Sequence, residues 1–324
     1  KHIFGISDFL SLCINKNLDY FFGILDNSPE DSLKLLINDL NSTYTNFFDL
    51  LIRENSKDKA KKYLFKELRI IKQKISLLVA TNDLGKTWSL TKVIENLSYL
   101  ADNLIRVAVN CLLLESNSNG DFSSNNLQNP SKNSSYFILA LGKLGGKELN
   151  YSSDVDLIAL YDDNINTNYL GTKSTHEFFI NITKSLVRIL SERTEDGYVF
   201  RTDFRLRPDA GATPLALSVS AAETYYESVG QNWERAALIK ARPIAGDMIA
   251  GNEFLKNLKP FIWRKNLDYA AISDIKSIKR QIDTKENNSD FKIDGYNLKL
   301  GKGGIREIEF FAQTQQLIYG GRNH

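Results

Sequence analysis

The sequence contains very little cysteine and histidine. Its 324 residues include two cysteines, Cys13 and Cys111, and three histidines, His2, His176 and His324. Neither cysteine has a second Cys or a His at the spacing of metal ligands, which argues against a Cys/His zinc site and against a disulfide framework. So little cysteine is typical of a protein in a reducing compartment, and we expect a cytoplasmic location.

The sequence also lacks an excess of either charge. Lys and Arg number 41 against 39 Asp and Glu, a net charge of +2, whereas a dedicated nucleic-acid-binding protein usually shows a clear basic excess. No apolar run approaches the roughly 18 residues of a membrane span, and no signal peptide precedes the first helix. We therefore expect neither a nucleic acid nor a membrane as partner. The chain opens at Lys1 rather than Met, as expected of a piece of a longer protein.

What is present is typical of a globular protein, with 42% hydrophobic and 25% charged residues. This composition and length suit two or three packed modules. We predict an α+β protein, helical for the most part, with a mixed sheet in its core. The predicted divisions are an N-terminal helical domain (1–115), a linker (116–135), a catalytic core (136–245) and a truncated C-terminal helical region (246–324).

The first of these divisions shows helical periodicity. Apolar residues recur at helical spacing from Leu64 to Leu78 and again from Leu90 to Leu114. Pro29 directly after Ser28 is typical of a capped helix start. In the linker, thirteen of twenty residues are Ser or Asn. Such a segment buries little, so we expect it to be mobile.

From residue 136 the pattern becomes mixed. Apolar runs predict strands over 136–141, 154–161 and 198–206, and an amphipathic pattern predicts a helix over 173–193. Beyond Pro208 the pattern is mostly helical, with interruptions around 243–246, 295 and 301–304.

Two carboxylates begin the second of these strands. Side chains at i and i+2 share a face of a strand, so Asp154 and Asp156 should lie side by side. Adjacent carboxylates repel each other, and a divalent cation relieves that repulsion. Ligands that are all oxygens favour Mg²⁺ or Mn²⁺.

The third strand is expected to supply partners for this pair. Alternation places Asp203, Arg205 and Arg207 on one face, with Phe204 and Leu206 on the other. Asp203 can complete a carboxylate cluster, and the guanidinium groups can bind phosphate oxygens. Paired metal ions about 3.5–4 Å apart are usual for displacement at phosphorus.

A glycine-rich turn joins the first strand to the next helix. Glycines let the backbone approach a ligand, and a helix N-terminus offers free N–H groups to an anion. The spacing matches neither a Walker loop nor a dinucleotide fingerprint. The candidate nucleotide- or phosphate-binding residues here are Gly142, Lys143, Gly145, Gly146 and Ser153.

Each of these features has a simpler interpretation. Two Asp at i and i+2 occur by chance at strand edges, Gly-Gly is usually a plain turn, and the face of Asp203 could be solvated. Their succession as strand, glycine turn, Asp-x-Asp strand and acidic strand nevertheless indicates a nucleotidyltransferase.

Four motifs then carry a family resemblance. In order they are GKLGGKELNYSSDVD (142–156), RTDFRLRP (201–208), WERAALIKAR (233–242) and GGIREIEF (303–310). With these motifs the chain resembles the N-terminal half of the bifunctional glutamine synthetase adenylyltransferase/adenylyl-removing enzymes.

The resemblance implies a polymerase-β-like core flanked by helical domains, with one or two Mg²⁺ ions, replaceable by Mn²⁺, on Asp154, Asp156 and Asp203. It implies removal of AMP from a tyrosine of glutamine synthetase by phosphorolysis, which yields ADP. It also implies that this activity belongs to a bifunctional enzyme that uses ATP and is regulated by a PII-type nitrogen-signalling protein. Lys240 and Arg242 join the candidates for holding inorganic phosphate. The loop 208–214 lacks two glycines that many members have.

Three alternatives stay open at this point. The same fold could adenylylate glutamine synthetase or transfer nucleotides to a polynucleotide, because fold does not determine function. A non-catalytic docking module is the third, although all three carboxylates are present.

Overall fold

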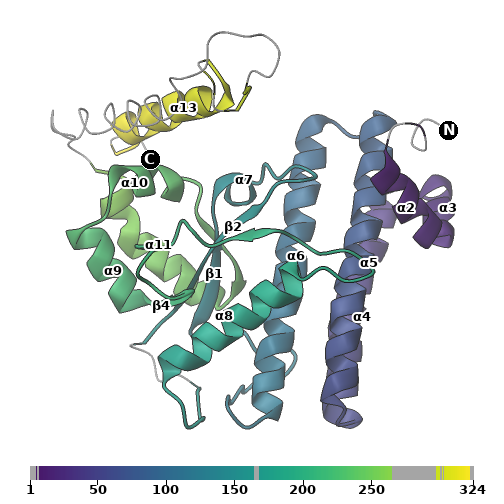
Figure 1. Cartoon of the computed structure of the whole chain (residues 1–324), viewed down its shortest axis with the longest axis horizontal. Helices are drawn as coiled ribbons and strands as arrows, with labels where there is room; N and C mark the ends of the chain where they lie inside the picture. The colour runs from purple at the N-terminus through teal and green to yellow at the C-terminus, as the bar shows by residue number, and fades with distance from the viewer. Residues whose placement is uncertain are drawn as a thin grey trace.

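A computed structural model describes residues 5, 7–163, 168–264, 297–299, 301 and 303–321. It is mostly helical, with one mixed sheet between two groups of helices (Figure 1). The predicted α+β class is therefore confirmed. Most of residues 265–296, part of the predicted C-terminal helical region, lie outside the described residues, as does the interruption predicted at 295.

Helices make up the N-terminal part, as the periodicity predicts. Ser28 caps α4 by accepting a hydrogen bond from the backbone N–H of Asp31. Leu68 and Leu104, which belong to the two long helices that follow, are fully buried. The elements are α2 (Asp8–Lys16), α3 (Leu18–Asp26), α4 (Pro29–Phe48), the π-helical turn η1 (Asp49–Arg53), α5 (Lys57–Leu84) and α6 (Leu90–Ser118).

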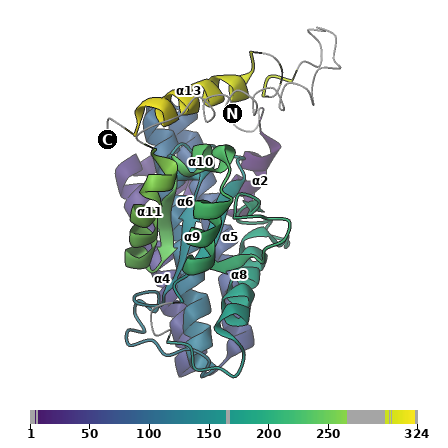
Figure 2. The ribbon, with the colours of Figure 1, turned by 90° about the vertical axis from the view of Figure 1, so that its left-hand side faces the viewer.

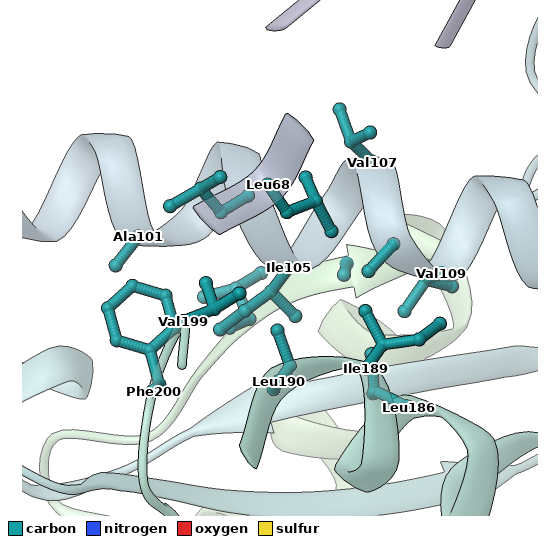
Figure 3. Packing of buried hydrophobic residues seen from close by; sticks show 14 of the residues in the cluster. Leu68, Ala101, Ile105, Val107, Val109, Leu186, Ile189, Leu190, Val199 and Phe200 are labelled. Carbon is teal, nitrogen blue, oxygen red and sulfur yellow. The ribbon is translucent and has the colours of Figure 1, made fainter. Parts of the chain in front are cut away.

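Among the described residues, α6 alone is long and apolar enough to cross a membrane by length and composition. However, 78% of its apolar window is buried inside the protein. This burial is what the core helix of a folded domain shows. In Figure 3, residues of α6 such as Ile105 and Val109 pack against Leu186 and Ile189.

The sheet has five strands, in the order β3-β2-β1-β5, with β4 also pairing with β2. The β1 strand is antiparallel to β2 and β5, while β3 and β4 run parallel to β2. The strands are β1 (Tyr136–Ala140), β2 (Val155–Tyr161), β3 (Thr202–Asp203), β4 (Ala216–Ser218) and β5 (Arg242–Gly246).

Both faces of this sheet are covered. Tyr136 and Ile138 of β1 belong to the hydrophobic cluster shared with the N-terminal helices and with α8 (Thr175–Ser191). Phe137 and Leu139 point to the opposite cluster, because side chains alternate along a strand. That second cluster contains residues of α9 (Val219–Ser228), α10 (Asn232–Leu238) and α11 (Met248–Ile262), which Figure 2 shows together. The short helix α7 (Gly142–Gly145) follows β1, and α13 (Ile305–Tyr319) lies beside α10.

Residues 116–135 are held by specific contacts. The first three complete α6, Phe122 is buried and pairs with Tyr169, and Ser131 donates a hydrogen bond to Asn110. The carbonyl of Leu127 accepts a hydrogen bond from a tyrosine of α4. The N-terminal helices also share one continuous hydrophobic cluster with the sheet. The division into separate domains stays a prediction.

The strand predicted over 198–206 is wrong in its extent. The third strand covers only Thr202–Asp203, because the chain turns immediately afterwards. As a result Phe204 and Leu206 pack into different clusters instead of sharing a face. The interruption of the helical pattern predicted at 243–246 is confirmed, and the segment there forms the strand β5, which the sequence pattern did not predict. It lies at the edge of the sheet, where a proline is tolerated.

Candidate functional site

Two carboxylates lie side by side on neighbouring strands. In the parallel pairing of β2 with β3, Asp156 is directly opposite Asp203. Two residues upstream, Asp154 lies just before β2 begins. The sequence placed Asp154 and Asp156 together, and strand pairing adds Asp203 to them.

Asp156 is a partly buried carboxyl group with a raised pKa. Burial, the charge of Asp203 and the charge of Asp154 raise the pKa of Asp156 from 3.8 to about 6. Gly142 is part of this burial, since its backbone has φ +55° and a Cβ there would lie 2.3 Å from Oδ2 of Asp156. Glycine at 142 therefore satisfies the turn and leaves room for the carboxylate.

Asp154 is turned toward an arginine. The Arg201 Nε donates to Oδ1 of Asp154 at 2.5 Å, and its second terminal nitrogen donates to the carbonyl of Ser152 at 2.6 Å. Both side chains of the ion pair are about half exposed, at 53% and 51%. An exposed ion pair of this kind contributes little stability and can open at low cost.

Asp203 is held by the turn that ends β3. Its Oδ1 accepts the backbone N–H of Arg205 at 2.8 Å, and the guanidinium of Arg205 donates to both carboxylate oxygens. These side-chain hydrogen bonds lower the pKa of Asp203 below its ordinary value. The Arg205 side chain is 84% exposed, so it reaches solvent beside the carboxylates.

The structure corrects the assignment of two other arginines. The guanidinium of Arg207 donates to the backbone carbonyls of Phe204, Ala210, Thr213 and Pro214. These bonds hold the 208–214 loop closed. Because this guanidinium is directed at four carbonyl groups, we remove Arg207 from the candidate phosphate-binding residues.

Arg242 is engaged in the same way. It makes a bidentate ion pair with Asp102 of α6, at 2.7 and 3.0 Å, and donates to the carbonyls of Leu144 and Gly145. These contacts join α6, β5 and the end of α7. We therefore assign Arg242 to positioning the glycine turn rather than to phosphate.

The glycine turn lies next to the carboxylates. A Cβ at Gly145 would meet the carbonyl of Lys240 at 2.3 Å, and one at Gly146 would meet the Lys240 side chain at 2.9 Å. Lys240 itself pairs with Glu148 at 2.6 Å beside the turn. Lys143 is exposed, and within the described residues no ion pair engages it.

The helix in this turn, α7, has only four residues, so it offers no extended helix N-terminus to an anion. Ser153 donates to the side chain of Asn150 at 2.5 Å. Both Ser153 and Lys143 stay candidates, and the exposed ammonium group is the more direct one for a phosphate.

Two cations near the site were not assigned from the sequence. Arg201 belongs to the 201–208 motif, but it lies before the stretch of alternating charges from which the site was predicted. Lys299 is distant in sequence, and its charge partly offsets the rise in the pKa of Asp156. Gly301, Gly303 and Gly304, which follow Lys299 closely in the sequence, were the feature that could have marked this segment as part of the site.

The donors present suit a hard divalent cation, because carboxylate oxygens are the ligands that Mg²⁺ prefers. Within the part of the chain that the structure describes, no three His, Cys, Asp or Glu side chains stand close enough together to form a finished metal site. The reason is that Asp154 faces Arg201, and Asp203 faces Arg205. Metal binding would require Asp154 to turn from its arginine toward Asp156.

Comparison with known proteins agrees with the four motifs. A family model described as "Glutamate-ammonia ligase adenylyltransferase" matches residues 1–257, and one described as "GlnD PII-uridylyltransferase" matches residues 276–324. Three similar proteins carry the name bifunctional glutamine synthetase adenylyltransferase/adenylyl-removing enzyme. The protein of Mesorhizobium japonicum is 52% identical over 259 residues, which are 80% of this chain and 26% of that protein.

The proteins of Brucella suis and Bartonella quintana are 43% and 46% identical, each over 99% of this chain, and over 31% and 32% of their own lengths. The chain thus spans about a third or less of the relatives it matches. By the extent of the family match and the identity along its length, the chain belongs to the glutamate-ammonia ligase adenylyltransferase family.

Proposed function

We propose that this chain carries the adenylyl-removing activity of a longer bifunctional enzyme. In this reaction inorganic phosphate displaces a tyrosine of glutamine synthetase from its AMP ester, releasing ADP. The observation that carries the proposal is the pairing of Asp156 with Asp203 across adjacent strands, with Asp154 two residues upstream. A polymerase-β-like core and regulation by a PII-type protein in the cytoplasm are parts of the same proposal.

The three carboxylates would hold Mg²⁺, or Mn²⁺ in its place. The fit rests on the pairing of Asp156 with Asp203, where burial, the charge of Asp203 and the charge of Asp154 together raise the pKa of Asp156. Clustered carboxylates with this mutual repulsion are stabilised by a divalent cation. When bound, the metal would supply positive charge to the attacking and departing oxygens at phosphorus.

The chain's own cations would hold the anionic reactants. Arg205 stands beside Asp203 and Arg201 beside Asp154, while Lys143 lies within the glycine turn and Lys240 next to it. An oxygen of phosphate forms a bond to the phosphorus of the ester, and the bond from that phosphorus to the tyrosine oxygen breaks. The phenolate that leaves then takes a proton from solvent. Preorganised positive charge around the phosphoryl oxygens is the main contribution we assign to the protein.

The reaction needs no strong general base, because phosphate is already an anion at neutral pH. The position of the described histidine is consistent with a reaction that uses no histidine as a base. His176, the one histidine among the described residues, bonds to Tyr161 at 2.9 Å, at the opposite end of β2 from Asp156.

The adenylylation direction and polynucleotide transfer are the competing enzymatic functions. The near-neutral charge of the chain does not favour a polynucleotide. Adenylylation uses the same carboxylates, so only the reaction itself separates the two directions.

The decisive experiment measures ADP release from adenylylated glutamine synthetase, with magnesium and with phosphate varied. We expect release that saturates with phosphate and is abolished in Asp156→Asn. Asp163→Asn is the matched control, because Asp163 follows the far end of β2 and bonds to Ser220. Release of free AMP without any need for phosphate would overturn the proposed reaction.

A further inference from the structure

A cavity opens on the side of the N-terminal helices, and its wall includes Ser152, two residues before Asp154. Its volume is about 480 Å³, within the usual range of small-molecule sites. Its walls come from α2, the end of α5, the turn before β2 and the segment before β3. The residues that carry the argument are Phe9, Asp83, Leu84, Tyr151, Ser152 and Tyr198.

One guanidinium joins this cavity to the proposed catalytic site. The Ser152 carbonyl in the cavity wall accepts a hydrogen bond from Arg201, and the same guanidinium is paired with Asp154. A ligand in the cavity would therefore lie one arginine side chain away from the first carboxylate. Any molecule whose phosphorus sits at the carboxylates could extend its next group into this space.

The walls suit a flat aromatic ring. Tyr151 and Tyr198 provide aromatic surface, while Phe9 and Leu84 are 56% and 52% exposed and form an apolar edge. A bound ring would cover these exposed apolar groups. Stacking between a base and aromatic side chains is a common way for proteins to hold nucleotides.

One polar group in the wall can identify the base. Oδ2 of Asp83 accepts the hydroxyl of Tyr151 at 2.8 Å. No hydrogen bond from any described residue engages Oδ1, which leaves it as an acceptor. An acceptor at the edge of an aromatic site matches the exocyclic amine of adenine and opposes the 6-oxo group of guanine or hypoxanthine.

We propose that this cavity binds the adenine base of the adenylyl group, with Asp83 accepting a hydrogen bond from its amine. The assignment deepens the proposed function and rests on it for the identity of the nucleotide. A protein segment beside the modified tyrosine is the competing occupant. The volume of about 480 Å³, which is that of a small-molecule site, and the unengaged Oδ1 of Asp83 favour a compact ring over an extended peptide.

The experiment measures binding of ADP and IDP to the 324-residue chain by calorimetry in the presence of magnesium. Asp83→Asn should weaken ADP binding about tenfold and favour IDP, because the new amide can donate to a 6-oxo group. Tyr198→Ala should weaken both nucleotides about tenfold through lost stacking. Phe9→Ala should weaken both nucleotides by removing part of the apolar edge. Phe22→Ala is its matched control and should leave both affinities unchanged, since Phe22 is 58% exposed on α3, outside the cavity wall.

Unchanged ADP affinity in both Asp83→Asn and Tyr198→Ala would overturn the adenine site, as would a wild-type chain that binds no ADP. Equal weakening of ADP and IDP in Asp83→Asn would also overturn the role of Asp83. A raised KM for adenylylated glutamine synthetase with unchanged ADP affinity would assign the cavity to the protein substrate. The failures are separable, because a chain that binds ADP here but shows no phosphate-dependent release refutes only the proposed reaction.

Discussion

The ion pair between Arg242 and Asp102 gives the sharpest test of how the glycine turn is held in place. The two side chains are only 20% and 10% exposed, and they make two hydrogen bonds to each other. The same guanidinium satisfies the carbonyls of Leu144 and Gly145. Replacing Arg242 with Met removes all four bonds while keeping much of the side-chain volume.

The expected loss is large. Removing one partner of a buried ion pair costs about 3–5 kcal/mol, because the other charge is left without compensation. Each buried carbonyl that loses its donor adds about 1 kcal/mol. Against a typical stability of about 5–15 kcal/mol, Arg242→Met should therefore lose a large share of the free energy of unfolding.

Urea unfolding followed by circular dichroism measures this change. Lys240→Met is the matched control, because Lys240 lies two residues upstream in a more exposed pair with Glu148. Its expected cost is at most about 1 kcal/mol. Asp102→Leu combined with Arg242→Met should recover part of the stability, since well-packed apolar residues can replace a buried ion pair.

The dependence on pH offers a second check. Burial raises the pKa of Asp102, and the bonds from Arg242 offset part of that rise. Without Arg242 the carboxyl should take up a proton more readily in the folded state. The destabilisation should then be smaller at pH 5 than at pH 8. If Arg242→Met unfolds like the wild type but raises the KM for phosphate, then Arg242 binds the substrate and the structural role is refuted.

Three further predictions concern the carboxylates themselves. Gly142→Ala should reduce turnover at least tenfold by displacing Asp156. Gly197→Ala is the control, because Gly197 also has a positive φ, +90°, but has open space around it, so this substitution should lower stability alone. Equal turnover in the two variants would refute the clash with Asp156. Because the pKa of Asp156 is raised to about 6, the folded state binds more protons than the unfolded state between about pH 4 and pH 6, so its contribution to stability falls as pH rises. Asp156→Asn should remove this slope and be more stable at pH 7 by about 1–2 kcal/mol after allowance for partial exposure, measured by thermal unfolding across pH. Arg201→Gln should bind Mn²⁺ several-fold more tightly, because the guanidinium no longer competes for Asp154. Electron paramagnetic resonance measures this affinity. An unchanged affinity would show that the Arg201–Asp154 ion pair does not oppose metal binding.

The sequence by itself determined the main helices and the strands β1 and β2. Their apolar pattern is strong: it is periodic in α5 and α6 and continuous in β2. It also determined the pair Asp154 and Asp156, because a spacing of two residues is a local property of a strand. These features depend on neighbours in the chain, which the sequence displays directly.

The tertiary structure decided which residues surround that pair. The sequence predicted that Asp203 would join the pair, and the tertiary structure fixed its place directly opposite Asp156, in a pairing of only two residues. It directed Arg207 and Arg242 to backbone carbonyls and to Asp102, while Arg201 and Lys299 came to the carboxylates. A guanidinium looks the same in a sequence whether it meets phosphate or a carbonyl, because its partner is chosen by packing between segments far apart in the chain.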